Sequence, residues 1–187
     1  MRIYTTRRAL VRAGLLLAFA PAGAVAQRAA KPPEKQRPQP GDALVFADGD
    51  RKGEKLLADH LERDAAPLLA YPVDPAGVIR DGSRLNQVLV LRLEPAQLTP
   101  KVAARASEGI VAYSAVCTHT GCAISGWRAE ELRLVCPCHG SEFDVLDGAK
   151  ALNGPASKPL AMLPLSVEAG ELRVARGFTR RVGFKPQ

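Results

Sequence analysis

Two short loops hold all four cysteines and two of the three histidines of this 187-residue chain. The first loop, residues 117–122, reads C-T-H-T-G-C, and the second, residues 136–141, reads C-P-C-H-G-S. The pattern C-x-H is thus followed, after 16 intervening residues, by C-x-x-H, with one extra cysteine in each loop. Sulfur and imidazole nitrogen donors at such spacing are typical of a metal site.

Two kinds of metal site fit this donor set. Four such ligands bind either one zinc ion or a two-iron cluster in which each iron has two protein ligands. Zinc modules usually pair cysteine with cysteine and histidine with histidine along the chain. Here each loop supplies one cysteine and one histidine to the pattern, so the two loops would hold one metal centre from opposite sides. This favours an asymmetric cluster, and a structural zinc site stays open as an alternative.

The two loops resemble the cluster-binding loops of Rieske iron–sulfur proteins. The resemblance implies one [2Fe-2S] cluster per chain as the cofactor. It assigns Cys117 and Cys136 to one iron, and His119 and His139 to the other. If the site bound zinc instead, the protein would be colourless and redox-silent.

The resemblance also concerns residues around the ligands. Cys122 and Cys138 match the pair that forms a disulfide between the loops in the high-potential branch of the family. Ser141 matches a serine that donates to a bridging sulfide, and Phe143 stands where high-potential respiratory members have a tyrosine. Rieske centres span ~−150 to +300 mV, against ~−400 mV for four-cysteine ferredoxins. We therefore expect a potential above the low-potential, ferredoxin-type Rieske proteins and below relatives that have the tyrosine.

A third segment, residues 153–160, resembles the proline loop that shields the cluster in this family. The resemblance gives Gly154 and Pro155 this shielding role. An ordinary turn is the alternative, because Gly-Pro pairs are common in loops.

The composition favours a turn-rich β fold, because 16 glycines and 15 prolines divide the chain into short segments. We expect strands at 43–47, 68–73, 87–93, 110–116, 132–135, 163–169 and 171–175. One helix is expected at 54–64, and one helical turn within 95–107. With the resemblance, this implies an all-β domain at 42–187: an antiparallel sheet sandwich as base domain, with a small inserted cluster-binding subdomain of two loops at about 115–158.

The N-terminus reads as a twin-arginine signal peptide over residues 1–26. Arg7 and Arg8 precede an apolar run at 13–20, and small residues precede Gln27. Clusters are inserted in the cytoplasm, so a folded-protein export route to the bacterial periplasm suits a cluster protein. Residues 27–41, rich in proline and charge, are expected to form a disordered tether. Contact with a membrane is expected only if the signal segment is retained as an anchor.

The expected function is one-electron transfer, and the chain alone is not expected to be an enzyme. Residues 110–119 and 141–144 resemble the small Rieske subunit of arsenite oxidase, which implies a molybdenum catalytic subunit, a c-type cytochrome or a cupredoxin as redox partner. A membrane-anchored Rieske subunit of a cytochrome bc-type quinol oxidoreductase is the alternative. Rieske oxygenases need a further iron held by two histidines and a carboxylate, and only His60, expected at the surface, would remain. Nucleic-acid binding is disfavoured, because removing residues 1–26 lowers the net charge from +7 to +3.

Overall fold

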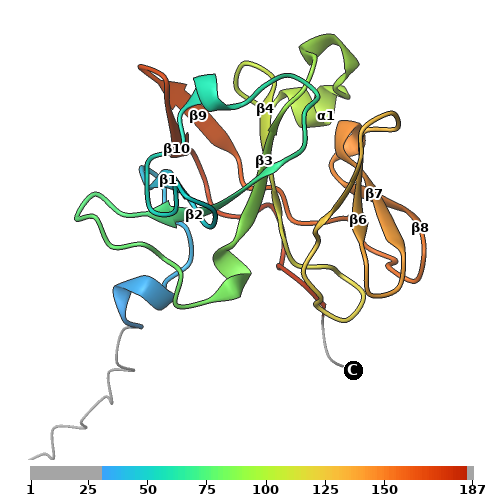
Figure 1. The fold of residues 1–187 in the computed structure, drawn as a ribbon, viewed down its shortest axis with the longest axis horizontal. Helices are drawn as coiled ribbons and strands as arrows, with labels where there is room; N and C mark the ends of the chain where they lie inside the picture. The colour runs from blue at the N-terminus through green and yellow to red at the C-terminus, as the bar shows by residue number, and fades with distance from the viewer. Residues whose placement is uncertain (1–30, 185–187) are drawn as a thin grey trace, which may run out of the picture. The chain divides into compact units, whose positions relative to one another are not determined.

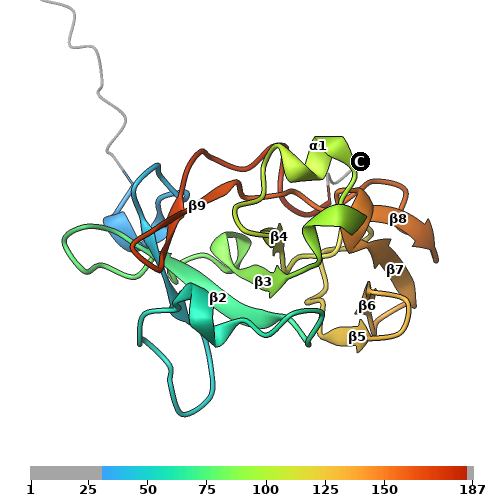
Figure 2. The ribbon, with the colours of Figure 1, turned by 90° about the horizontal axis from the view of Figure 1, so that it is seen from above.

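The computed structural model describes residues 31–184. The expected signal peptide and the first residues of the expected tether lie outside this range. Within it, two antiparallel sheets account for nearly all regular structure, with strand orders β4-β3-β2-β1-β10-β9 and β5-β6-β7-β8. The all-β, antiparallel class is confirmed. Figures 1 and 2 both place the four-stranded sheet at one end, next to β3 and β4.

The six-stranded sheet forms the base of the domain. Its strands are β1 (Ala43–Phe46), β2 (Leu68–Val73), β3 (Val88–Arg92), β4 (Ile110–Ser114), β9 (Leu165–Glu168) and β10 (Glu171–Val174). Each lies within one of the expected strand segments, and β9 with β10 forms the expected hairpin. The smaller sheet contains β5 (Gly126–Arg128), β6 (Arg133–Cys136), β7 (Ser141–Asp144) and β8 (Lys150–Asn153). Of these, the sequence indicated only β6.

Strand β3 separates two apolar cores. It pairs with β2 on one side and β4 on the other, which confirms it as a central strand. Leu89 and Leu91 point into a core shared with the small sheet, whereas Val88 and Val90 point into the core of the base. This alternation follows from the two-residue period of a strand. Leu89 and Leu91 thus pack the base against the small sheet, while Val88 and Val90 pack within the base.

Strand β4 repeats this division and leads to the first cysteine loop. Val111 and Tyr113 face the shared core, whereas Ile110 and Ala112 face the base. The hydroxyl of the fully buried Tyr113 donates to the carbonyl oxygen of Val145 at 2.7 Å. This bond satisfies a buried polar group and joins β4 to the segment after β7.

The prediction of a helix at 54–64 is wrong. The segment contains one 3-10 turn, Ala58–His60, and otherwise runs extended beside the base sheet. The backbone N–H of Leu56 donates to the carbonyl of Leu44 at 2.9 Å, and Leu57 bridges to Glu171. The leucine spacing that suggests a helix is satisfied instead by burial against β1 and β10. The remaining helical structure of residues 31–184 is α1 (Pro100–Ala103) and four 3-10 turns: Pro33–Lys35, Arg84–Asn86, Pro95–Gln97 and Val145–Asp147. Two short helical elements, Pro95–Gln97 and α1, lie within 95–107, where the sequence predicted a single helical turn.

Residues 31–41 do not form the disordered tether that the sequence predicted. Asp42 and Arg80 form a buried ion pair, with Nε to Oδ2 at 2.6 Å and a second contact at 2.9 Å. Arg80 also donates to the carbonyl of Pro33 at 3.0 Å, and the buried amide of Asn86 donates to the carbonyl of Gln36 at 2.7 Å. Buried charges and amides need such partners, and this segment supplies them.

Across residues 31–184, no helix has the length and apolar character to cross a membrane.

Candidate metal centre

The first cysteine loop leaves β4 and closes on itself. The N–H of Cys117 donates to the carbonyl of Cys122 at 2.8 Å, and the N–H of Gly121 donates to the carbonyl of Cys117 at 3.1 Å. Gly121 has a φ of 84°, a left-handed conformation that glycine adopts without strain. These bonds fix the loop that carries His119.

The second loop is the tip of the β6–β7 hairpin. Cys136 and Ser141 are opposite each other in the pairing, and the N–H of Gly140 donates to the carbonyl of Cys136 at 3.0 Å. Cys136 is buried, whereas Cys138 and His139 at the tip are exposed. The hairpin therefore buries one donor and presents the other at the surface.

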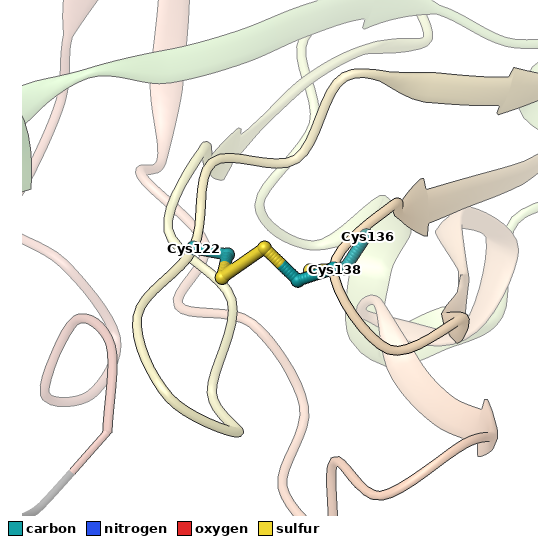
Figure 3. Close-up of side chains that lie close together, drawn as sticks. All are labelled: Cys122, Cys136 and Cys138. Atoms are coloured by element: carbon teal, nitrogen blue, oxygen red, sulfur yellow. A yellow bond between two sulfur atoms is a disulfide. The ribbon is translucent and has the colours of Figure 1, made fainter.

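A disulfide between Cys122 and Cys138 joins the two loops, as the resemblance implied. Figure 3 shows this bond, with Cys136 beside it. The sulfur atoms of the three cysteines lie within 4.8 Å of one another. They are not a ligand set, however, because a disulfide sulfur offers no thiolate to a metal. The disulfide instead fixes the two loops relative to each other.

The other two cysteines are free thiols in the shared core. Cys117 is 1% exposed and Cys136 is 2% exposed. Burial raises the pKa of the Cys117 thiol, and the neighbouring Cys136 adds to the rise. Hydrogen bonds from the backbone of His119 and the side chain of Ser141 act in the opposite direction on the same pKa. Cys117 and Cys136 are therefore adjacent, and donors already face the Cys117 sulfur.

The two loop histidines are in contact. The ring centroids of His119 and His139 lie 4.8 Å apart, with the planes at 87°. The Nδ1 atom of His119 is buried and has no hydrogen-bond partner among the described residues. Buried polar atoms are almost always paired, so an unpaired imidazole nitrogen beside a second imidazole is a position that a metal ion would satisfy. Two free thiols and two touching imidazoles fit a two-iron cluster.

Ser141 and Phe143, which the resemblance placed around the site, both lie on β7 and are fully buried. The Ser141 hydroxyl oxygen accepts the N–H of Ala156 at 3.1 Å, which leaves its hydrogen available to a sulfur. Phe143 packs in the shared core and has no hydroxyl. Its effect on the potential stays a prediction.

The proline loop packs against the second cysteine loop at Gly154. A Cβ atom on Gly154 would lie 2.6 Å from the Cα of Ser141 and 2.8 Å from the carbonyl oxygen of Gly140. Pro155, the other predicted residue of this loop, is exposed next to this contact. From the first loop, the hydroxyl of Thr118 donates to the carbonyl of Lys158 at 2.6 Å. The segment thus contacts both cysteine loops, as a shielding wall requires.

Sequence reasoning missed Glu142, which cross-links the small sheet. Its carboxylate accepts from Arg133 and Asn153 at 3.0 Å each, and lies 3.1 Å from a guanidinium nitrogen of Arg128. The hydrogen bond from Asn153, then that from Arg133, holds the pKa of Glu142 below its usual value. The four residues come from four different strands, and their sequence positions alone do not indicate a network.

The family model described as the Rieske [2Fe-2S] domain matches residues 78–164. The chain contains a Rieske [2Fe-2S] domain. The match spans β3, β4 and the whole small sheet, with both cysteine loops and the proline loop. A domain of this family binds a two-iron, two-sulfide cluster through cysteine and histidine, in agreement with the donors described above.

Named relatives carry the same domain. The chain is 42% identical over 98 residues to the cytochrome bc1 complex Rieske iron-sulfur subunit of Streptomyces lividans, which covers 51% of this chain and 58% of that protein. It is 35% identical over 144 residues to the putative respiratory nitrate reductase subunit Rieske of Haloferax mediterranei, covering 76% of this chain and 60% of the relative. The chain thus spans about three fifths of the length of these two relatives. Among solved structures, the ferredoxin of carbazole 1,9a-dioxygenase from Nocardioides aromaticivorans has a TM-score of 0.45 at 20% identity, covering 74% of this chain and 98% of that one.

The Gly154 contact gives a direct test of the proline loop. Gly154→Ala should lower the free energy of unfolding by about 3 kcal/mol, because the added methyl group overlaps the backbone of Ser141 and the φ of 77° is strained for alanine. Gly77→Ala, in a turn outside the cysteine loops, is the matched control: its φ of 86° is also positive, but nothing lies within 4 Å. It should cost about 1 kcal/mol. Both variants are compared by denaturant unfolding and by their content of bound iron. If the two variants lost the same amount of stability and of iron, the packing argument would be contradicted.

Proposed function

We propose that this protein is a one-electron carrier whose cluster is held by Cys117 and Cys136 on one iron and by His119 and His139 on the other. The observation that carries the proposal is that the same two loops supply two buried free thiols and two touching imidazoles, and that one imidazole has a buried nitrogen without a partner among the described residues. When bound, the cluster supplies reversible one-electron redox chemistry. The Rieske domain match supports this assignment.

The residues around the donors divide the site into a closed and an open side. Cys117 and Cys136 lie in the apolar core, which excludes water from the sulfur ligands. Ser141 and the backbone of His119 present hydrogen bonds to sulfur, and such bonds stabilise the more negative, reduced state and raise the potential. His139 is exposed, so electrons are expected to enter and leave at the histidine side through a small, transient contact.

The partner is proposed from the relatives and the loops together. Both named relatives are subunits of respiratory assemblies, one of a cytochrome bc1 complex and one, by its name, of a nitrate reductase. We propose that this chain serves as the Rieske subunit or partner of a periplasmic oxidoreductase, with a molybdenum enzyme of the arsenite oxidase type as the first candidate. The 42% identity to a bc1 subunit keeps a quinol-oxidising complex as the second.

Export to the periplasm is part of the proposal and has its own test. If residues 1–26 are a cleaved twin-arginine signal, N-terminal sequencing of the exported protein should begin at Gln27. Replacing Arg7 and Arg8 together by lysine should leave the precursor in the cytoplasm. The control Arg37→Lys makes the same change outside residues 1–26 and should not affect export. A membrane-bound protein that retains Met1 would favour the anchored, bc-type alternative.

The ligand assignment is tested by exchanging one histidine. His139→Cys should lower the midpoint potential by roughly 200 mV, toward the range of thiolate-rich clusters, or abolish cluster binding. His60→Cys is the matched control, because His60 lies on a turn of the base where its ring contacts Phe46. It should leave the midpoint and the rhombic reduced-state resonance unchanged. A wild-type midpoint in His139→Cys would contradict the assignment.

A further inference from the structure

Three arginines from distant parts of the chain meet beside the first cysteine loop. Arg37 follows the first 3-10 turn, Arg84 begins another, and Arg181 lies in the C-terminal segment. They line one pocket of about 470 Å³. Its other lining residues are apolar side chains or glycines, and no carboxylate is among them: Leu85, Val116, Gly121, Val182, Gly183 and Phe184. The three arginines are therefore the charged side chains of the pocket, and all three are cationic.

These arginines differ from most others in the described part of the chain. Seven arginines there have a carboxylate within ion-pair distance: Arg51, Arg63, Arg80, Arg92, Arg128, Arg133 and Arg173. None of the three pocket arginines has such a partner among residues 31–184. Partial burial, followed by the charge of Arg181, lowers the pKa of Arg37. Like charges held together without a counter-charge are unfavourable, so their convergence calls for an anionic partner.

The pocket is built rather than merely exposed. One guanidinium nitrogen of Arg37 donates to the carbonyl of Leu85 at 2.7 Å and to the side chain of Asn86 at 3.3 Å. Asn86 is fully buried and held in turn by the carbonyls of Gln36 and Arg80. The remaining guanidinium donors of Arg37 are thus fixed in direction, which lowers the entropy lost when they bind an anion.

The pocket also touches the metal centre. A guanidinium nitrogen of Arg84 and the ring of Phe184 lie 3.3 Å and 3.0 Å from the position of a Cβ on Gly121. Gly121 lies two residues after His119 and directly before the disulfide cysteine Cys122. Any molecule bound here is therefore in contact with the loop that carries a candidate ligand of the cluster.

We propose that this arginine pocket is a docking site for carboxylate side chains of an acidic redox partner, an inference that rests on the proposed electron-transfer function. The open pocket beside the first loop suits acidic side chains that project from a protein surface, and Phe184, 39% exposed, supplies an aromatic contact at its rim. Paired charges of this kind speed association and fix orientation, and they add little affinity at physiological salt. This is the behaviour that a transient electron-transfer encounter requires.

The test uses the full, cluster-loaded chain and a dye-labelled oligoglutamate peptide, with binding followed by fluorescence anisotropy at low salt. Arg84→Glu and Arg181→Glu should each weaken peptide binding about tenfold, since each replaces an attraction by a repulsion. Arg176→Glu is the control: it changes the net charge equally, but Arg176 lines a different pocket. It should change binding less than about twofold. If a glutamate variant does not fold, Arg84→Gln is used in its place. This milder change should also weaken peptide binding.

Two results would overturn the inference. An equal loss in Arg176→Glu would show that only net charge matters. Displacement of the peptide by inorganic phosphate at matched ionic strength would identify a small-anion site. The reduced-state resonance is recorded on the same samples, so its absence refutes the cluster proposal, whereas its presence without arginine-dependent binding refutes only the docking site.

Discussion

The burial of Cys117 and Cys136 in the core shared by the two sheets is the constraint on which the rest of the structure depends. These thiols pack with the inner faces of β3, β4 and β7, so two of the four candidate ligands are core residues as well. Close packing of that core fixes the direction of both cysteine loops, because a well-packed interior tolerates little displacement. The disulfide and the proline loop then act on loops that the core has already brought together.

This arrangement explains why the site is rigid on one side and accessible on the other. The sulfur donors lie among apolar side chains, whereas His139 reaches the surface at the hairpin tip. Low local dielectric strengthens the hydrogen bonds that face sulfur, and exposed imidazole leaves a short path to a partner. The arginine pocket is lined in part by Gly121 of the first loop, two residues after His119, which connects the charge of the surface with the site.

The sequence predicted the base strands and the site loops well, because both depend on local patterns. The alternation at Leu89 and Leu91 indicated a central strand, and the C-x-H and C-x-x-H spacing indicated the metal centre. The helix at 54–64 failed because Leu56 and Leu61 fit burial against a sheet as well as a helical face. The sequence missed β5, β7 and β8 because these strands show no apolar alternation: β7 buries the polar Ser141 and Glu142, and β8 is mostly exposed.

Long-range polar contacts could not be predicted in the same way. Asp42 meets Arg80 across 38 residues, and Arg37 comes together with Arg181 from opposite ends of the described chain. No local pattern encodes such pairs, since they arise from the topology of the sheet. The close approach at Gly154 was indicated only as a resemblance, and the backbone contact with Ser141 gives it a physical reason.

The central claim is that both loop histidines bind the same cluster. Pulsed electron paramagnetic resonance of the reduced protein, labelled with ¹⁵N only in histidine, tests it most directly. The account predicts two strongly coupled ¹⁵N nuclei per cluster, one from each loop. A reduced cluster without coupled histidine nitrogen, or a protein that binds zinc and gives no reduced-state resonance, would contradict it.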